Sequence, residues 1–263
     1  MFLPFLTASL KKGFFKMQIL YFSCLTNRLV KYLSSVQFFK DIYGIFFPKM
    51  CINCGQILSD EDEILCIDCL HLLPETHFTA LKANLTERAF YGRIDIVAAT
   101  SLYYLRKNGI VQKLIYQLKY NNNQKIGRYF GHKMAYELKK SGRFKELECI
   151  VPVPLHPKKK RKRGYNQLTL FGKTIAATLG IPYVEDKLIR KSVTTSQTKK
   201  SRWERFKNAK EIYVNNEVSF FVNKNVLLID DVFTTGATLE ACTKALQKSN
   251  GIKVSLATMA CVE

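Results

Sequence analysis

The sequence lacks any uninterrupted apolar run of the roughly 18 to 20 residues that a membrane-spanning helix needs. Its aromatic N-terminal stretch is interrupted by charge at Lys11, Lys12, Lys16, Arg28, Lys31, Lys40 and Asp41. A secretory signal would place its positive charge before the apolar core and a small-residue cleavage site after it, whereas the first lysines here follow the run FLPFL. We therefore expect no transmembrane span and no export, and hence a cytoplasmic protein.

The first residues leave two interpretations open. Met17 stands in front of a more ordinary sequence, so residues 1–16 are interpreted as lying before the native start. The alternative is an amphipathic surface helix that touches a membrane or a partner, which would make the protein membrane-peripheral. In both interpretations residues 1–46 are an N-terminal extension.

Acidic residues are also scarce, and unevenly so. Residues 101–263 contain 31 Lys and Arg against 12 Asp and Glu, within a chain whose formal net charge is +20. A domain of this charge favours polyanions, meaning nucleic acid, phosphorylated metabolites or anionic lipid, but charge alone does not choose among them. The common nucleotide-binding loops G-x-x-x-x-G-K-[ST] and G-x-G-x-x-G are both missing.

Cysteine spacing gives the first specific signal. Cys51, Cys54, Cys66 and Cys69 form C-x2-C-x11-C-x2-C, and four thiolates make a closed tetrahedral shell that suits a structural Zn²⁺. Two disulfides in an exported protein would be the alternative, but the missing signal and the four other cysteines favour a reducing compartment. His71 could replace a ligand, although a lone histidine between leucines is more typical of packing.

The remainder of the chain alternates between strand and helix patterns. Residues 74–92 have little periodicity and are predicted to be a linker, with a domain boundary near residue 90. Predicted helices cover 109–120, 124–140, 165–179 and 236–249, and predicted strands cover 94–105, 149–154, 225–230 and 252–261, with shorter strands around 181–192 and 211–222. The pattern predicts an α/β fold with a mainly parallel sheet and helices on both faces.

Two adjacent acids follow the most apolar strand. In VLLIDDVFTTGAT, Asp230 and Asp231 are expected at the carboxyl end of a central strand, where α/β sheets bind ligands. The strand-to-helix turn that follows contains hydroxyls and backbone amides suited to a phosphate, contributed by Thr234, Thr235, Gly236, Ala237 and Thr238. Paired carboxylates beside such a cradle suit ribose hydroxyls or Mg²⁺. The stretch therefore predicts a pocket for a ribose 5-phosphate.

The same stretch resembles the signature of type I phosphoribosyltransferases that binds 5-phosphoribosyl 1-pyrophosphate (PRPP), with Phe233 in place of the usual aliphatic residue. More of the chain is similar to the ComF family of competence-associated proteins, in which a four-cysteine zinc module precedes a phosphoribosyltransferase-like domain. The matching segments are FPKMCINCG, LIYQLKY with Lys119, VPVPLHPKKKRKRGYNQ, RKSVTTSQTKKSRWERFKN and VLLIDDVFTTGAT. The resemblance implies a four-cysteine zinc-ribbon or knuckle module in residues 47–90 and a type I phosphoribosyltransferase-like domain in residues 91–263.

The resemblance also implies roles for individual residues. After VPVPLHP come the six cations Lys158 to Arg163, of which Arg161 and Arg163 are expected to face pyrophosphate or nucleic acid, while a solvated patch is the alternative. Residues 190–208 are expected to form a closing lid, with Arg190 and Arg205 steadying the leaving pyrophosphate. Lys200 stands where the family usually has leucine, and Trp203 either stacks on a base or packs in the core.

Several functions remain open at this point. In the first, the protein binds PRPP or a nucleotide phosphoribosyl group with Mg²⁺ and handles single-stranded DNA during uptake in natural competence, alongside other competence proteins. The second is a metabolic phosphoribosyltransferase that transfers phosphoribosyl from PRPP to an unknown nitrogen acceptor. The third is a PRPP-sensing regulator.

Overall fold

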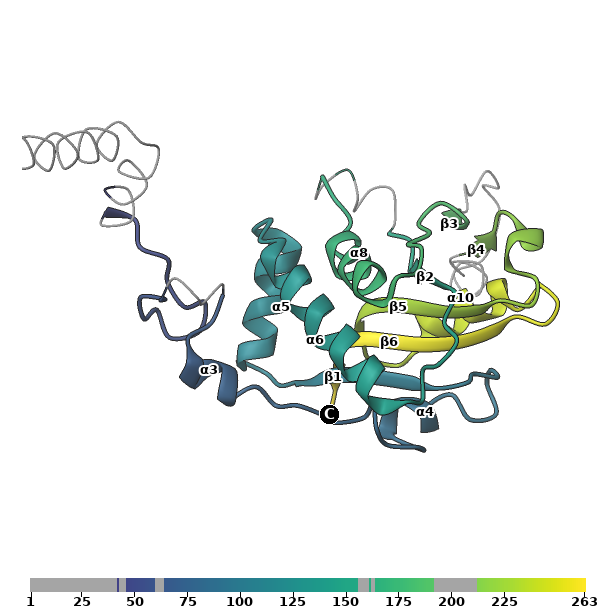
Figure 1. The fold of residues 1–263 in the computed structure, drawn as a ribbon, viewed down its shortest axis with the longest axis horizontal. Helices are drawn as coiled ribbons and strands as arrows, with labels where there is room; N and C mark the ends of the chain where they lie inside the picture. The colour runs from purple at the N-terminus through teal and green to yellow at the C-terminus, as the bar shows by residue number, and fades with distance from the viewer. Residues whose placement is uncertain (1–41, 43–45, 60–63, 156–160, 162–163, 192–211) are drawn as a thin grey trace, which may run out of the picture.

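The computed structural model describes residues 46–59, 64–155, 164–191 and 212–263, together with Ile42 and Arg161 (Figure 1). The helices among these residues are α3 (Ile67–His71), α4 (Leu85–Arg88), α5 (Ile110–Tyr120), α6 (Lys125–Ser141), α8 (Leu168–Leu179), the 3-10 helix η1 (Val218–Phe221) and α10 (Ala237–Leu246). The strands are β1 (Ala99–Leu105), β2 (Cys149–Pro152), β3 (Leu188–Lys191), β4 (Ile212–Asn215), β5 (Asn225–Phe233) and β6 (Lys253–Val262).

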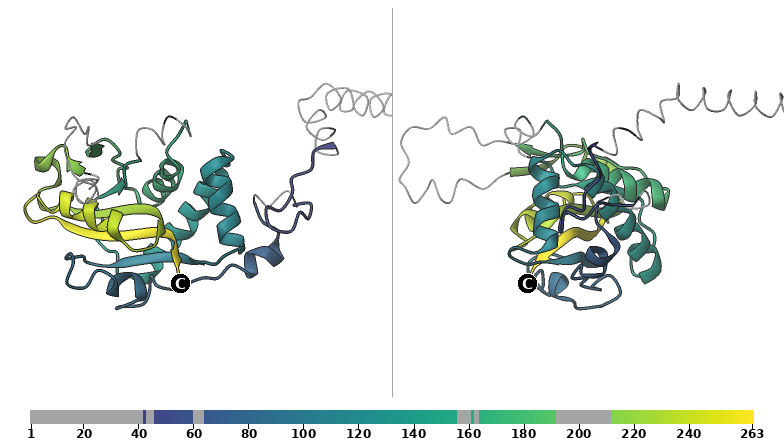
Figure 2. Two further views of the ribbon diagram at one scale, coloured as in Figure 1. Left: turned by 180° about the vertical axis from the view of Figure 1, so that it is seen from behind. Right: turned by 90° about the vertical axis from the view of Figure 1, so that its left-hand side faces the viewer.

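Four strands form a parallel sheet in the order β1-β6-β5-β2. The chain crosses it from β1 to β2 through α5 and α6, and in the opposite direction from β5 to β6 through α10. Right-handed crossovers in opposite directions lie on opposite faces. Accordingly α5, α6 and α8 cover one face and α10 covers the other (Figure 2). The predicted mainly parallel sheet with helices on both faces is confirmed.

Continuous apolar runs explain why β5 and β6 are central. Val226 to Ile229 of β5 are fully buried, as are Leu256 and Ala257 of β6, because helices cover both faces of a parallel sheet. The helices on one face contribute a single apolar stripe each. In α5 this stripe is Val111, Leu114, Ile115 and Leu118.

The main difference from the predicted elements lies at the end of β5. The strand was predicted to end at Asp230, but it continues to Phe233 because β6 pairs with it as far as Cys261. On the other side, pairing with β2 stops at Pro152 and Ile229. From Asp230 onward, therefore, β5 has a neighbouring strand on the β6 side only, and the β2 side opens toward other parts of the chain.

The strands predicted around 181–192 and 211–222 are shorter than expected. They form an antiparallel hairpin of β3 and β4, and the chain after β4 continues as η1 instead of as strand. Tyr183 makes only an isolated bridge to Ile150. Part of the lid predicted in residues 190–208, with Arg205, Lys200 and Trp203, lies outside the described residues, as do Arg163 and nearly all of the N-terminal extension.

The stretch predicted to be a linker, residues 74–92, is instead packed against the sheet. The amide of Thr76 donates to the carbonyl of Leu102 at 2.9 Å, which covers the outer edge of β1. Farther along, Phe90 is fully buried and α4 contacts β1. The sequence of residues 74–92 has low periodicity because the segment consists of short turns. A segment that follows the edge of a sheet needs no long amphipathic pattern. The boundary near residue 90 stays a prediction about folding units.

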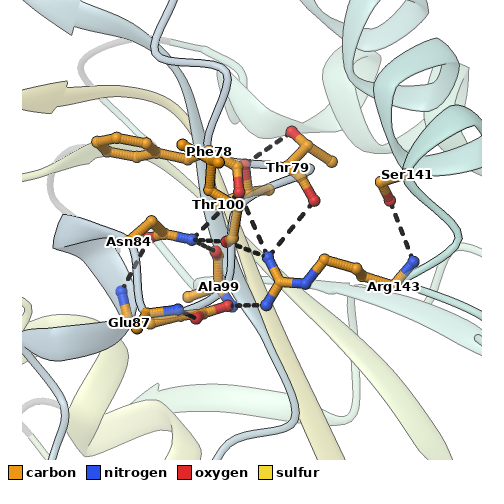
Figure 3. Close-up of polar contacts among 10 residues, drawn as sticks. Phe78, Thr79, Asn84, Glu87, Ala99, Thr100, Ser141 and Arg143 are labelled. Atoms are coloured by element: carbon orange, nitrogen blue, oxygen red, sulfur yellow. Dashed lines mark hydrogen bonds and ion pairs between the residues drawn. The ribbon is translucent and has the colours of Figure 1, made fainter.

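A buried ion pair holds this stretch to the end of α6 (Figure 3). The guanidinium of Arg143 pairs with the carboxylate of Glu87, whose side chains are only 14% and 8% exposed. That carboxylate also accepts hydrogen bonds from the amides of Ala83 at 2.6 Å and Ala99 at 3.1 Å. Asn84 donates to the carbonyl of Ala99 at 2.9 Å and caps α4. Every group of the cluster is therefore paired, as a buried charge requires.

No helix among the described residues is long and apolar enough to cross a membrane. The four-cysteine module, with α3, extends from the sheet domain beyond α5 (Figures 1 and 2).

We expect Arg143→Met to destabilise the chain by about 3 kcal/mol, because it leaves the Glu87 carboxylate buried without its cation. Urea-induced unfolding measures this loss. The control is Arg106→Met, since the pair between Arg106 and Glu263 is exposed and should contribute less than about 1 kcal/mol. Equal unfolding midpoints for the two variants would contradict the structural role of the buried pair.

Candidate functional site

A cavity of about 370 Å³ lies at the carboxyl ends of β2 and β5. Its apolar wall is the chain that follows β2, residues 153–155, together with Val232. The polar lining combines two cations, two carboxylates and three neutral groups, namely Lys119, Arg190, Asp230, Asp231, Gln167, Tyr213 and Thr238. The volume suits a small metabolite or one nucleotide unit rather than a polymer.

Asp231 is the most tightly held carboxylate of the cavity. It is 8% exposed, and its Oδ2 atom lies 2.9 Å from the ammonium of Lys119 and accepts a hydrogen bond from Gln167 Nε2 at 2.8 Å. Its backbone amide donates to Oδ1 of Asp230 at 2.8 Å. Lys119, Gln167 and the backbone amide of Asp231 therefore orient the two carboxylates and the lone pairs of their other oxygen atoms.

The loop Gly164-Tyr165-Asn166-Gln167 brings Gln167 to this position. Tyr165 donates its hydroxyl proton to the carbonyl of Leu118 in the last turn of α5. Asn166 Oδ1 accepts from the amide of Leu168 at 3.1 Å and so starts α8. One short loop thus fastens α8 to the end of α5 that carries Lys119, and both donors reach Asp231 together.

The β3–β4 hairpin supplies another wall. Arg190 on β3 lies over the ring of Tyr213 on β4, with 5.7 Å between the guanidinium carbon and the ring centroid. Burial raises the pKa of Tyr213, although the charge of Arg190 opposes this in part, so the phenol is protonated at neutral pH. This wall therefore presents one cation and one neutral hydroxyl to the cavity.

The turn before α10 depends on a glycine. Gly236 has a φ of +74°, a left-handed conformation that other residues adopt with strain. A Cβ atom there would also lie 2.8 Å from the ring of Phe90 and 2.9 Å from that of Phe233. Both the conformation and the packing require glycine, and they expose Thr234, Thr235 and Ala237 at the helix N-terminus.

Arg93 braces the same turn from outside the sheet. Its guanidinium donates to the carbonyl of Thr235 at 3.2 Å and to that of Ala89 at 2.9 Å, and it pairs with Glu240. The carboxyl of Glu240 has a lowered pKa, because Lys244 and Arg93 donate hydrogen bonds to it. The acid in the first turn of α10 is thus neutralised by two cations, and the N-terminus retains its preference for an anion.

The predicted site residues divide into three groups. Asp230, Asp231, Thr238 and Arg190 lie together in the cavity wall. Thr234, Thr235, Gly236 and Ala237 form the adjacent turn without appearing in that wall. Arg161 is exposed and does not line the cavity, and Arg163 and Arg205 lie outside the described residues.

Sequence reasoning had assigned no role to Lys119, Gln167 or Tyr213. Lys119 and Gln167 each occurred in a segment that the family resemblance had marked. A usable signal for Lys119 was its place next to the buried stripe of α5, where a lysine can reach inward along its neighbours. Tyr213 had no such signal, because only the hairpin brings β4 to the cavity.

The four predicted metal ligands lie together in the N-terminal module. The sulfur atoms of Cys51, Cys54, Cys66 and Cys69 all lie within 4.8 Å of one another. Cys54 Sγ and Cys66 Sγ are 3.7 Å apart, close to the edge of about 3.8 Å that a tetrahedron with Zn–S bonds of about 2.3 Å would have. The four thiols are therefore close enough together to bind one tetrahedral Zn²⁺.

The pKa values of Cys51 and Cys69 are shifted in opposite directions. Burial opposes ionisation of Cys51, but hydrogen bonds from the backbone at Cys54, Cys66 and Asn53 lower its pKa to about 6. Cys69 accepts a hydrogen bond from Asn53, yet burial and the neighbouring thiols raise its pKa to about 12. The Cys51 thiolate forms readily, whereas the pKa values of Cys66 and Cys69 are raised, in part by the neighbouring thiols, and a bound dication would favour their ionisation.

One helix connects the two sites. Lys113, near the start of α5, donates to the carbonyl and to Oδ1 of Asn53 at 3.2 and 2.9 Å. Asn53 in turn donates to Cys69 Sγ at 3.3 Å. At its other end the same helix carries Lys119 into the cavity. The four-cysteine module is therefore fastened to the helix that positions Asp231.

Curated relatives cover most of the chain. Competence protein F of Haemophilus influenzae is 33% identical over 221 residues, which is 77% of this chain and 93% of that protein. Competence protein ComFC of Streptococcus pneumoniae is 24% identical over 76% of this chain and 94% of its own. The DNA utilization protein YhgH of Salmonella typhimurium is 26% identical over 54% of this chain and 63% of its own. No family model matches the sequence.

Among solved structures, an adenine phosphoribosyltransferase of Leishmania tarentolae aligns with a TM-score of 0.36 and 16% identity, over 72% of this chain and 94% of that one. A second adenine phosphoribosyltransferase aligns with a TM-score of 0.35 and 17% identity, over 54% and 74% of the two chains. Overlap at this level does not by itself identify an activity.

We expect the purified chain to contain about one zinc ion, and Cys54→Ser to lose it, because three thiolates form an incomplete shell. Elemental analysis by mass spectrometry measures zinc per chain. The control is Cys149→Ala: burial raises the pKa of the Cys149 thiol to about 11, so it is not a ready ligand, and the zinc content should be unchanged. Full zinc in the Cys54 variant would rule out a four-thiolate site.

Proposed function

The chain belongs to the ComF family of competence proteins, and from that premise we propose that its cavity binds the phosphoribosyl group of PRPP or of a nucleotide, while its basic surface handles single-stranded DNA. The observation that carries the proposal is the pair Asp230 and Asp231 beside the turn Thr234–Thr238. We further propose that residues 1–46, 47–90 and 91–263 act as extension, zinc module and phosphoribosyltransferase-like domain.

The chemistry of the pocket supports a ribose phosphate. Asp231 is held by Lys119 and Gln167 through Oδ2, and this arrangement leaves Oδ1 as an acceptor for a ribose hydroxyl. The turn at Gly236 presents hydroxyls and the first amides of α10 to a phosphate. The two acids suit the neutral hydroxyls of the ribose, and the turn suits the phosphate dianion. Together they match the two parts of a ribose 5-phosphate.

The pyrophosphate of PRPP would lie toward the cations. Arg190 already lines the cavity, and Arg161 follows β2 in the sequence. Mg²⁺ would accompany the pyrophosphate and neutralise part of its charge. Guanidinium groups suit this part of the ligand because they bind phosphate oxygens in pairs.

The DNA part of the proposal is supported by charge and by relatives. The excess of cations in residues 101–263 favours a polyanion, and the printed names of the relatives concern competence and DNA utilization. A transferase reaction at the ribose C1 remains the second candidate, because the same acids and cations would stabilise a departing pyrophosphate. Release of pyrophosphate from PRPP in the presence of nitrogen bases distinguishes transfer from binding alone.

We expect the double change Asp230→Asn, Asp231→Asn to weaken binding of PRPP with Mg²⁺ by more than about 100-fold, because each acid contributes a charged hydrogen bond of about 1.5 to 3 kcal/mol. Isothermal titration calorimetry measures the affinity. The matched control is Glu185→Gln, Asp186→Asn, an adjacent acidic pair that is exposed and outside the cavity. If both double variants bind PRPP like the unchanged chain, the pocket is not the PRPP site.

Lys119→Met should weaken PRPP binding by about tenfold or more, because it leaves Asp231 without its cation and adds net negative charge to a cavity for phosphates. Lys119→Arg retains the charge and should recover part of the affinity. The exposed Lys107→Met serves as the control for loss of one charge elsewhere. Unchanged affinity in Lys119→Met, measured by the same calorimetry, would contradict a binding role for the lysine.

A further inference from the structure

The exposed face of α6 has an unusual composition. Lys125, Arg128, His132, Tyr136, Lys139 and Lys140 are all exposed and recur at spacings of one to four residues, which places them on one side of the helix. The opposite side, with Ile126, Phe130, Met134 and Leu138, is buried in the core. We name the six exposed residues the α6 stripe.

The positive charge of the stripe is not neutralised within the described part of the chain. Lys125, Arg128, Lys139 and Lys140 form no ion pair among the residues that the structure describes. The acids beside the stripe, Glu137 and Glu75, both pair with Lys133, at 3.1 and 2.8 Å. Four exposed cations on this side of α6 therefore pair with none of the acids that the structure describes.

The first turn of α6, where the stripe begins, packs with its buried side against the start of α8. Gly127, between Lys125 and Arg128, packs so closely on α8 that a Cβ atom there would lie 3.4 Å from the amide of Phe171 and 3.7 Å from the carbonyl of Gln167. Gln167 lines the cavity and holds Asp231. From Lys125 the stripe continues to Lys140, 15 residues or about 22 Å farther along the helix.

We propose that the α6 stripe binds the sugar-phosphate backbone of a single-stranded nucleic acid whose phosphoribosyl end lies in the cavity. The inference rests on the proposed function and names the surface that performs its DNA-handling part. The length of the stripe corresponds to about six nucleotides at the 3.4 Å spacing of a stacked strand. Lys125 and Arg128 at one end of the stripe, and Lys139 and Lys140 at the other, then contact phosphates at the two ends of that segment.

Tyr136 distinguishes a single strand from other polyanions. Tyr136 is 57% exposed, and the ammonium of Lys140 lies 5.8 Å from its ring centroid, so an aromatic residue lies among the cations. An exposed ring of this kind stacks on an unpaired base, which a duplex does not offer. An anionic membrane fits less well, because the apolar side of α6 that would enter the bilayer is buried in the core.

The test compares two variants with the same loss of charge. The stripe variant changes Lys125, Arg128, Lys139 and Lys140 to Gln, and the control variant changes the exposed Lys82, Arg88, Lys248 and Lys253 to Gln. Fluorescence anisotropy with a labelled oligothymidylate of about 20 nucleotides gives the affinity between about 50 and 200 mM salt. For the stripe variant we expect binding at least about tenfold weaker, and a slope of log K against log salt that falls by about 3 relative to the control variant.

The aromatic residue is tested separately. Tyr136→Ala should weaken binding of the oligonucleotide by about tenfold without changing the salt slope, because stacking is independent of counterion release. Tyr136→Phe retains the ring and should bind like the unchanged chain. A salt slope that falls in Tyr136→Ala, or full affinity in that variant, would overturn the stacking role.

The outcomes separate the inference from the proposed function. The unchanged chain could bind the oligonucleotide with a steep salt slope while the stripe and control variants lose the same affinity. That result would show that the α6 stripe is not the binding surface, but it would leave the DNA-handling part of the proposed function intact. If the unchanged chain binds no oligonucleotide, the DNA-handling part of the proposed function fails with it. Binding of phosphatidylserine vesicles that the stripe variant loses, with oligonucleotide binding retained, would assign the stripe to a membrane instead.

Discussion

The site depends on a carboxylate that is almost completely removed from water. Asp231 can occupy this position only with a cation and a further donor, and Lys119 and Gln167 supply them. Segments outside the cavity wall are needed to meet this requirement. Helix α5 ends where Lys119 reaches Asp231. The loop at Tyr165 connects the start of α8 to the same end of α5 through the carbonyl of Leu118. Pairing of β2 with β5 stops at Pro152, and the chain that follows β2 lines the cavity.

The parts of this arrangement that sequence could predict are those carried by local patterns. Apolar runs predicted β5 and β6, and amphipathic periodicity predicted α5 and α6. The Asp-Asp sequence predicted two acids at the end of a strand, where the structure places them in a cavity wall. The four cysteines were recognisable because metal ligands have fixed spacings. Each of these signals lies within a short stretch of chain, where periodicity and composition report directly on the environment of each residue.

What could not be predicted depends on contacts between distant segments. The end of β5 moved from Asp230 to Phe233 because only one of its two neighbouring strands stops, and no local signal at Asp230 records that difference. Residues 74–92 appeared to be a linker because their order comes from Arg143, more than 50 residues away in sequence. Lys119 likewise acquires its role only where α5 meets β5.

The size of the cavity determines how a long ligand could be held. A space of about 370 Å³ accommodates one phosphoribosyl unit, so the remainder of a nucleic acid must lie outside it. Under the proposed function, that remainder lies along the α6 stripe, whose cations pair with no described acid. Specificity for the end of a strand and affinity for its length are then separate properties. Under the proposed function, the first is a property of Asp230 and Asp231 and the second a property of the α6 stripe.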